Sequence, residues 1–404
     1  MHRVCEVLST LLIATRDCSI LTKVLESRIK WSLCYHMYTH KRWTWSYRVY
    51  LAFPTCIMYP LSFPSTTMAL GGNRNPRTTS QSREAALERE SRDPWFNLMS
   101  SSFVALVRND PLHIKSLEIR DLNITEVSAF TDEAFEAFLS QLTSFSLSIK
   151  EWENGVGWHM NTQQPFSGFA DCLDYWFFNN LQSVEEFIFD VASSFVLGKA
   201  GQAYYNDIGL RSAQMPRLRE LTLRNIIICK ELEDFIVRHV ETIEEISLQE
   251  CHAIIRREQY ADMEQRNWLE FFTSLTRTCS APSAALQSLG LLYDKTQIEM
   301  LDFDDAWDAL DELIEHAKEK LKVEPSAKAF FYANVSGKYG ARYRDVGTNL
   351  ERLIDGCDDQ AWRKFIEVLE SKTREHNRAS VTALKGEDRR GIKRKTSDAH
   401  GEQV

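Results

Sequence analysis

The sequence predicts an α/β protein in which parallel strands form one sheet and helices cover its outer side. A short phrase recurs six times, its first, fourth and sixth places are always apolar, and segments with helical periodicity lie between the copies. The copies are IKSLEI (114–119), LTSFSL (142–147), VEEFIF (184–189), LRELTL (218–223), IEEISL (243–248) and LQSLGL (286–291).

Each phrase is predicted to be a strand with one buried face, because apolar residues alternate with others. The fourth places hold Leu117, Phe145, Phe187, Leu221, Ile246 and Leu289. The fifth places hold Glu118, Ser146, Ile188, Thr222, Ser247 and Gly290, of which five are polar or glycine. Successive fourth places lie 25 to 43 residues apart. The array is therefore irregular.

Helices are predicted between the strands, over Thr131–Gln141, Phe169–Leu181, Glu231–Val240 and Gln265–Thr278. Thr131 is the expected N-cap of the first. Strands that run in the same direction and are joined by helices form a parallel sheet with the helices outside. One such unit cannot bury its apolar edge alone, whereas six stacked units can.

The chain divides into four parts. We predict a poorly defined N-terminal segment and linker (1–93), the array (94–300), an α/β C-terminal cap (301–373) and a disordered basic tail (374–404). The array opens with a helix from Trp95 that stops near Pro111. The cap is expected to contain an acidic helix, a hairpin and a last helix that covers the open end of the sheet, at Asp302–Leu321, Ala327–Val335 with Ala341–Val346, and Gln360–Ser371.

Charge and cysteine usage restrict the function. The net charge is −9, but residues 1–50 hold eight Lys and Arg against three acidic residues, so the body is acidic. An acidic body disfavours nucleic-acid binding, which depends on neutralising phosphates. Nine cysteines without a CxxC pair indicate free thiols in a reducing compartment. The basic cluster 389–395 resembles a nuclear import signal, so the expected location is cytoplasmic, nuclear or both.

A membrane anchor is also disfavoured. Residues 49–73 carry no charge, but Pro54, Pro60 and Pro64 would each remove a helical hydrogen bond inside the apolar segment.

Short motifs predict no cofactor, no metal and no catalytic residue. Cys34, His36 and His40 lack a fourth zinc ligand, and Gly155-Val-Gly157 lacks the third glycine of a nucleotide loop. Cys251-His252 is interpreted as a buried structural thiol beside a histidine rather than a nucleophile with its base. The acidic run 302–312 has helical spacing, which favours a solvated helix face over a calcium loop.

The candidate partner-binding residues lie on the outward strand face and on one loop. On the strands they are Glu118, Arg120, Ser146, Ser148, Asp190, Thr222, Arg224, Ser247 and Gln249. Exposed strand faces of repeat arrays are where partners dock, although ordinary solvated residues would give the same pattern. The insertion Glu151–Gly168 adds Trp152 and Trp158, which suit a partner contact or packing on their own unit.

The phrases resemble the LxxLxL strand segment of leucine-rich repeats. Ile243, Ile246, Leu248 and Cys251 match the longer form that ends in cysteine. The order of MPRLRELTLRNIII (215–228), a helix (230–240) and IEEISLQECHA (243–253) is similar to fungal F-box proteins with degenerate leucine-rich repeats. The resemblance covers about residues 98–300. It implies a leucine-rich-repeat-like solenoid, shaped as an irregular horseshoe.

The resemblance also implies a non-enzymatic substrate receptor of a cullin ubiquitin ligase. Such receptors bind the ligase linker subunit through an N-terminal helical motif opened by Leu-Pro. Residues 1–93 contain no Leu-Pro, and Leu8–Ile20 with Leu21–Leu33 is the nearest candidate for a decayed motif. The alternatives are a repeat scaffold without a ligase link and an enzyme with an unrecognised site.

Overall fold

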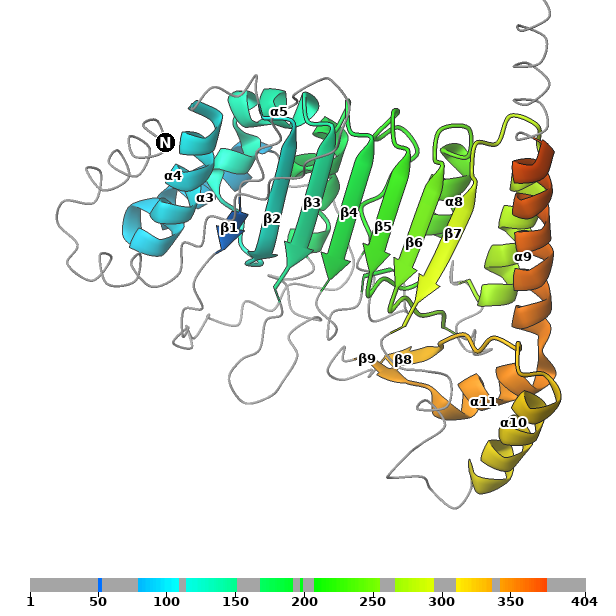
Figure 1. Cartoon of the computed structure of the whole chain (residues 1–404). Helices are drawn as coiled ribbons and strands as arrows, with labels where there is room; N and C mark the ends of the chain where they lie inside the picture. The colour runs from blue at the N-terminus through cyan, green and yellow to red at the C-terminus, as the bar shows by residue number, and fades with distance from the viewer. Residues whose placement is uncertain are drawn as a thin grey trace, which may run out of the picture.

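The fold is built on one parallel sheet of seven strands (Figure 1). The computed structural model describes residues 50–52, 79–108, 114–150, 168–191, 197–198, 207–254, 266–293, 310–335 and 342–375. The strands are β1 (Tyr50–Ala52), β2 (Ser116–Leu122), β3 (Ser144–Ile149), β4 (Glu186–Val191), β5 (Glu220–Arg224), β6 (Glu245–Gln249) and β7 (Ser288–Leu292). Each strand pairs with the next one along the chain. The six predicted phrases form β2 to β7, whereas β1 lies where no strand was predicted.

The register of the sheet matches the columns of the sequence. The fourth-place residues pair directly from Leu117 and Phe145 through to Ile246 and Leu289, and the sixth-place residues form a second matching row. Apart from Ile114 and Leu291, which are partly buried, the apolar residues of all three columns are buried. The prediction of parallel strands with one buried face is confirmed.

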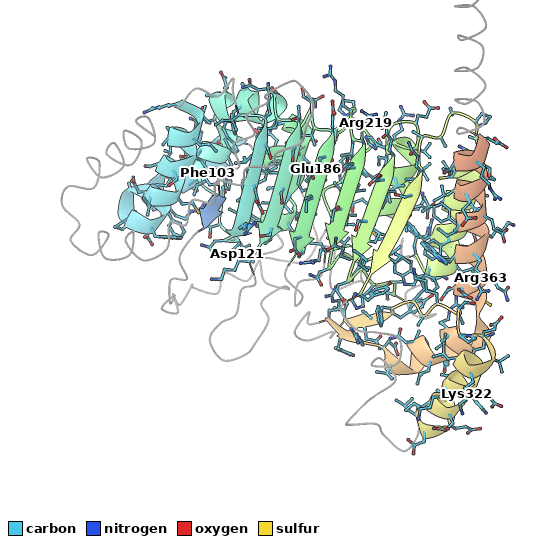
Figure 2. All side chains as sticks on the ribbon, viewed as in Figure 1. Phe103, Asp121, Glu186, Arg219, Lys322 and Arg363 are labelled. Carbon is cyan, nitrogen blue, oxygen red and sulfur yellow. The ribbon has the colours of Figure 1, made fainter. Side chains whose placement is uncertain are left out.

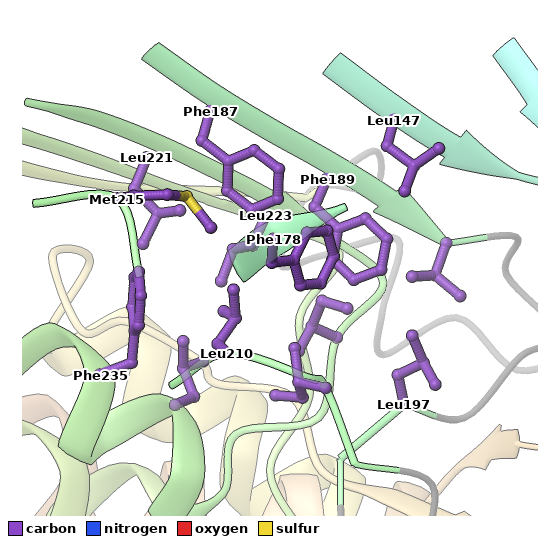
Figure 3. Packing of buried hydrophobic residues seen from close by; sticks show 14 of the residues in the cluster. Leu147, Phe178, Phe187, Phe189, Leu197, Leu210, Met215, Leu221, Leu223 and Phe235 are labelled. Atoms are coloured by element: carbon purple, nitrogen blue, oxygen red, sulfur yellow. The ribbon is translucent and has the colours of Figure 1, made fainter. Parts of the chain in front are cut away.

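Helices cover the buried face of the sheet. They include α4 (Pro94–Arg108), α5 (Glu133–Ser140), α8 (Lys230–Arg238) and α9 (Trp268–Cys279), and their apolar residues join the strand residues in one core. Figure 3 shows Phe187 and Phe189 of β4 in the layer that also holds Phe178, Leu210 and Phe235. Buried aromatic rings pack edge to face there, and the centroids of Phe178 and Phe187 are 5.3 Å apart.

The predicted N-cap at Thr131 is wrong. Residues Ser128–Thr131 form a 3-10 turn, in which the Thr131 hydroxyl donates to the Ser128 carbonyl over 3.1 Å. The cap is instead Asp132, whose carboxylate accepts from the Ala134 N–H over 2.9 Å. The hydroxyl of Thr131 is therefore engaged by the preceding turn, and the N-cap of α5 lies one residue later than predicted.

The single helix predicted over Phe169–Leu181 is also wrong. The segment contains the short helix α7 (Leu173–Trp176) and the 3-10 turn η3 (Phe178–Asn180). The break lets two consecutive rings both face the core. Phe177 packs against Phe145, and Phe178 packs against Phe187, whose ring stacks on that of Phe145. Neighbours on a regular α-helix point about 100° apart, so a continuous helix would turn one of the two rings away from this pair.

The remaining elements flank the sheet. They are α3 (Thr79–Arg92), α10 (Asp311–Val323), β8 (Ala333–Val335), β9 (Arg342–Arg344), α11 (Val346–Asp355) and a helix over 357–375. The β8–β9 hairpin is antiparallel, as predicted, but shorter. Residues 302–309 of the predicted acidic helix and 336–341 of the hairpin turn lie outside the described residues. The helix α11 was not predicted.

The last helix packs against α9. The ring of Phe272 lies 6.2 Å from Phe365 and 5.2 Å from Trp362, measured between centroids. Lys372 donates to the carbonyls of Ala281 and Ala284, which follow α9. The helix therefore extends the main core beyond the last helix of the array.

A second, short ladder joins the hairpin to the sheet beyond the carboxyl ends of the strands (Figure 1). Ile227 pairs with His252, and Ala253 pairs with Tyr332. Ile227 also donates to the Leu197 carbonyl over 3.0 Å. Gly198 has φ +107°, and a Cβ atom there would lie 2.8 Å from the Ile227 carbonyl oxygen, so the position requires glycine.

Candidate functional site: the exposed face of the sheet

The structure brings the predicted strand residues together on one face. The register aligns Glu118, Ser146, Thr222 and Ser247 in one row, together with Ile188 and Gly290. Ser148, Asp190, Arg224 and Gln249 form a second row two residues further on. All of them are partly or fully exposed, because they alternate with the buried columns.

Arg120 departs from the second row. The register between β2 and β3 shifts between Ile119 and Leu122, so that Arg120 and Asp121 form a bulge. Asp121 has φ +53° and its N–H donates to the Ser148 hydroxyl over 2.8 Å. Arg120 forms an ion pair with Glu118 over 2.6 Å. Trp152 and Trp158 lie outside the described residues.

A row of glutamates at the amino ends of the strands was missed by the sequence interpretation. Glu186, Glu220 and Glu245 occupy the same register on three adjacent strands. Burial raises the pKa of Glu220, and the negative charges of Glu186 and Glu245 raise it further. The signal was the third place of each phrase, which holds Ser or Glu in all six copies.

At the carboxyl ends of β5 and β6 the chain turns sharply. Asn225 follows β5 with φ +60°, and Glu250 follows β6 with φ +49°. Both positions are four residues beyond a fourth-place apolar residue, as is Asp121, which lies in the bulge of β2. Their N–H groups donate to the next strand, from Asn225 to Gln249 and from Glu250 to Leu292, each over 2.9 Å. Figure 2 marks the two edges of the face with Arg219 near the amino ends and Asp121 near the carboxyl ends.

A cavity of about 400 Å³ opens between these turns and the hairpin. Its lining consists of Arg224, Asn225, Glu250, His252, Arg342, Tyr343 and Arg344. Of these, Arg224 alone was a predicted site residue. Arg342 lies 117 positions from Asn225, to which it donates two hydrogen bonds of 3.1 Å, so no local pattern could have indicated the contact.

Two of the motifs that were weighed as catalytic or metal-binding sites lie at least partly in the described residues. Cys251 is 1% exposed, and burial raises the pKa of its thiol to about 12. Burial lowers the pKa of His252 well below its usual value. The predicted burial of the Cys251 thiol is confirmed. Asp311 and Glu312 lie exposed in the first turn of α10.

Within the described ranges, no group of three or more His, Cys, Asp or Glu side chains is arranged to hold a metal ion. Cys251, Cys279 and Cys357 are free thiols. Cys34, His36, His40 and the Gly155 motif lie outside the described ranges. None of the described helices is long and apolar enough to cross a membrane.

Comparison with known proteins identifies no relative. No protein-family model matches the chain, and neither does any curated protein or solved structure.

Proposed function

We propose that the protein is a non-enzymatic, leucine-rich-repeat-like solenoid whose exposed sheet face binds another polypeptide. The observation that carries this proposal is the row of Glu186, Glu220 and Glu245 on adjacent strands. Like charges directly opposite each other destabilise a sheet. These glutamates lower the stability of the sheet and do not contribute to the core. Residues that lower stability in this way are expected where their charges are needed for binding.

The repeat character of the fold supports the proposal. Strand order in the sheet follows the sequence from β1 to β7, and the units place equivalent residues at equivalent register. Cys251, the last residue of the longest repeat match, is buried, and its thiol lies 3.5 Å from the Leu223 carbonyl of the neighbouring unit. Repeat arrays use the broad surface that such stacking creates to hold partners.

The charge of the face defines the partner. Glu185 and Glu244 lie immediately before two of the three glutamates of the row, and Arg219 neutralises Glu244 through an ion pair. The amino edge therefore remains acidic. We infer a partner segment that presents basic side chains to this edge. Beside the edge, the face of this protein offers small polar side chains such as Ser146 and Ser247 to the same partner.

The double variant Glu220→Gln, Glu245→Gln tests the proposal. We expect it to be as stable as the native protein or more stable, by roughly 0.2–1 kcal/mol, because it removes cross-strand repulsion. Affinity capture from an extract, quantified against the native chain, should show a defined set of proteins reduced at least about tenfold.

The matched control is Glu315→Gln with Glu319→Gln, two exposed glutamates on α10 away from the face. The control should retain the captured set. Identical capture by the native chain and the face variant would rule out this edge as the binding surface.

A role as receptor for a cullin ubiquitin ligase is part of the proposal and is supported by the resemblance of residues 215–253. The segment of this chain that would bind the ligase linker subunit is Leu8–Leu33, which lies outside the described residues. A pull-down of the purified linker subunit with the full chain should recover a complex that deletion of residues 1–33 abolishes. Without such a complex, a scaffold role with no ligase link stands instead.

A further inference from the structure

The cavity at the carboxyl ends of β5 and β6 has a surplus of positive charge. Arg224, Arg342 and Arg344 contribute three guanidinium groups to its lining, and Glu250 contributes one carboxylate. His252 is neutral there, because burial and the charge of Arg342 lower its pKa. The lining itself carries two more positive than negative charges, and the Asp190 carboxylate, 3.7 Å from Arg224, offsets one of them.

Arg342 is partly buried in the wall of the cavity. Its guanidinium donates to the carbonyl and the side-chain oxygen of Asn225, which are both uncharged acceptors. Within the described residues it forms no ion pair with a carboxylate. Burial lowers its pKa to about 10, so the group is still charged at neutral pH. Glu250 attracts this charge without forming an ion pair with it, and burial still lowers the pKa, so the charge of Arg342 is only partly compensated.

Arg344 and Arg224 bring further donors to the same cavity. Arg344 lies over the ring of Phe331, 4.5 Å from its centroid, and 3.9 Å from the Glu250 carboxylate. Arg224 donates to Gln249 over 3.2 Å and lies 3.7 Å from Asp190. A guanidinium has five N–H donors, and these contacts use only some of them.

His252 adds a polar atom to the same wall. Its side chain is 4% exposed, and its Nδ1 atom makes no hydrogen bond of normal length and angle to any described residue. Buried polar atoms are normally satisfied, so an unsatisfied one beside a cationic cavity indicates room for a further group.

We propose that this cavity binds a phosphate group, held by the guanidinium groups of Arg224, Arg342 and Arg344. A phosphate monoester carries about −1.5 to −2 charges at neutral pH and three acceptor oxygens, so it can accept from more than one of the three guanidinium groups, whereas a carboxylate carries a single charge and two oxygens. Arginine also matches phosphate geometry, because two parallel N–H groups can donate to two oxygens.

The phosphate has two possible sources with the same chemistry. It can belong to a free phosphorylated molecule, or to a phosphorylated side chain of the polypeptide bound on the face. The second source rests on the proposed function, since Arg224 belongs both to the cavity and to the exposed row of β5. The first source does not depend on it.

The test is a calorimetric titration of the full chain with inorganic phosphate and with O-phosphoserine, at constant ionic strength. We expect saturable binding of both, and no comparable binding of acetate. Arg224→Gln and Arg344→Gln should each weaken it about tenfold or more, because each removes charge-assisted hydrogen bonds. Both side chains are partly exposed, at 47% and 27%, so these variants retain the fold, which a thermal melt checks.

Arg92→Gln is the matched control. Arg92 lies in the last turn of α3 with a side-chain exposure of 76%, away from the face and from the cavity lining. Its variant should bind phosphate as the native chain does. The proposal is overturned if the native chain shows no saturable binding, or if Arg224→Gln and Arg344→Gln bind as tightly as Arg92→Gln.

The source is distinguished by phosphoserine peptides. If the peptides bind the native chain much more tightly than O-phosphoserine does, and if this difference in affinity disappears in the Glu220→Gln, Glu245→Gln variant, the phosphate belongs to a partner polypeptide. Equal affinities assign it to a free molecule, and both results keep the site. The two proposals can fail separately. If the Glu220→Gln, Glu245→Gln variant loses the captured proteins but still binds phosphate, the two sites are independent. If Arg344→Gln loses phosphate binding but retains the captured proteins, the same conclusion follows.

Discussion

Replacement of Phe187 by alanine should lower the free energy of unfolding by about 3–5 kcal/mol. Phe187 is fully buried in the middle of the sheet, and its ring contacts Phe145, Phe178 and Phe189 with centroids 5.3 to 6.1 Å away. Phe145 and Phe189 sit on strands held by the sheet, so they cannot move far to fill the cavity. The measurement is urea unfolding followed by circular dichroism.

Ile188→Ala is the matched control for that variant. Ile188 is the next residue on β4, but its side chain lies on the exposed face. It should cost less than about 1.5 kcal/mol, since it leaves no internal cavity. Equal losses for the two variants would contradict the assignment of buried and exposed faces.

Asp358→Ala is expected to have a similar effect in the C-terminal part, about 3–5 kcal/mol. The Asp358 carboxylate is 1% exposed and accepts from Arg352 over 2.6 and 3.1 Å and from the Tyr332 hydroxyl over 2.8 Å. The carboxylate raises the pKa of Arg352, and burial raises the pKa of Tyr332. Its removal leaves a half-buried guanidinium and a buried hydroxyl without this acceptor.

Because Tyr332 also pairs with Ala253, the loss should spread to the junction with the sheet. Hydrogen exchange should then become faster for the amides of Ala253 and Ala333, which donate across that junction. The control is Glu315→Ala, which breaks an exposed ion pair with Lys318 on α10 and should cost under about 1 kcal/mol. Comparable destabilisation by both variants would show that the Asp358 cluster has no special role.

The strands could be predicted because their signal is local. Alternation within six residues fixes which side chains face the core, and repetition of the phrase aligns Leu117 with Phe145 and the strands that follow. Helix faces such as that of Trp268, Phe271 and Leu275 were equally readable from their spacing. The helix prediction failed where tertiary packing determines the local structure, as at Phe177 and Phe178, two consecutive residues whose rings are both buried in the core.

The candidate site was only partly predictable. The exposed rows follow from the same alternation. The glutamate row is also visible in the sequence, at the third place of three phrases, but no binding role was predicted for it. The cavity depends on a hairpin more than 100 residues away, which a parallel bridge from Ala253 to Tyr332 holds in place. Only the folded chain brings Arg342 to Asn225, so no spacing of residues could indicate the site.

The identity of strand order and sequence order also bears on synthesis in the cell. From β3 onward, each strand pairs with one that left the ribosome 25 to 43 residues earlier, so none of these strands waits for a distant segment. Short loops close quickly and at low entropic cost. The sheet can therefore grow strand by strand during translation, whereas the β8–β9 hairpin must find its place on a sheet that is already complete.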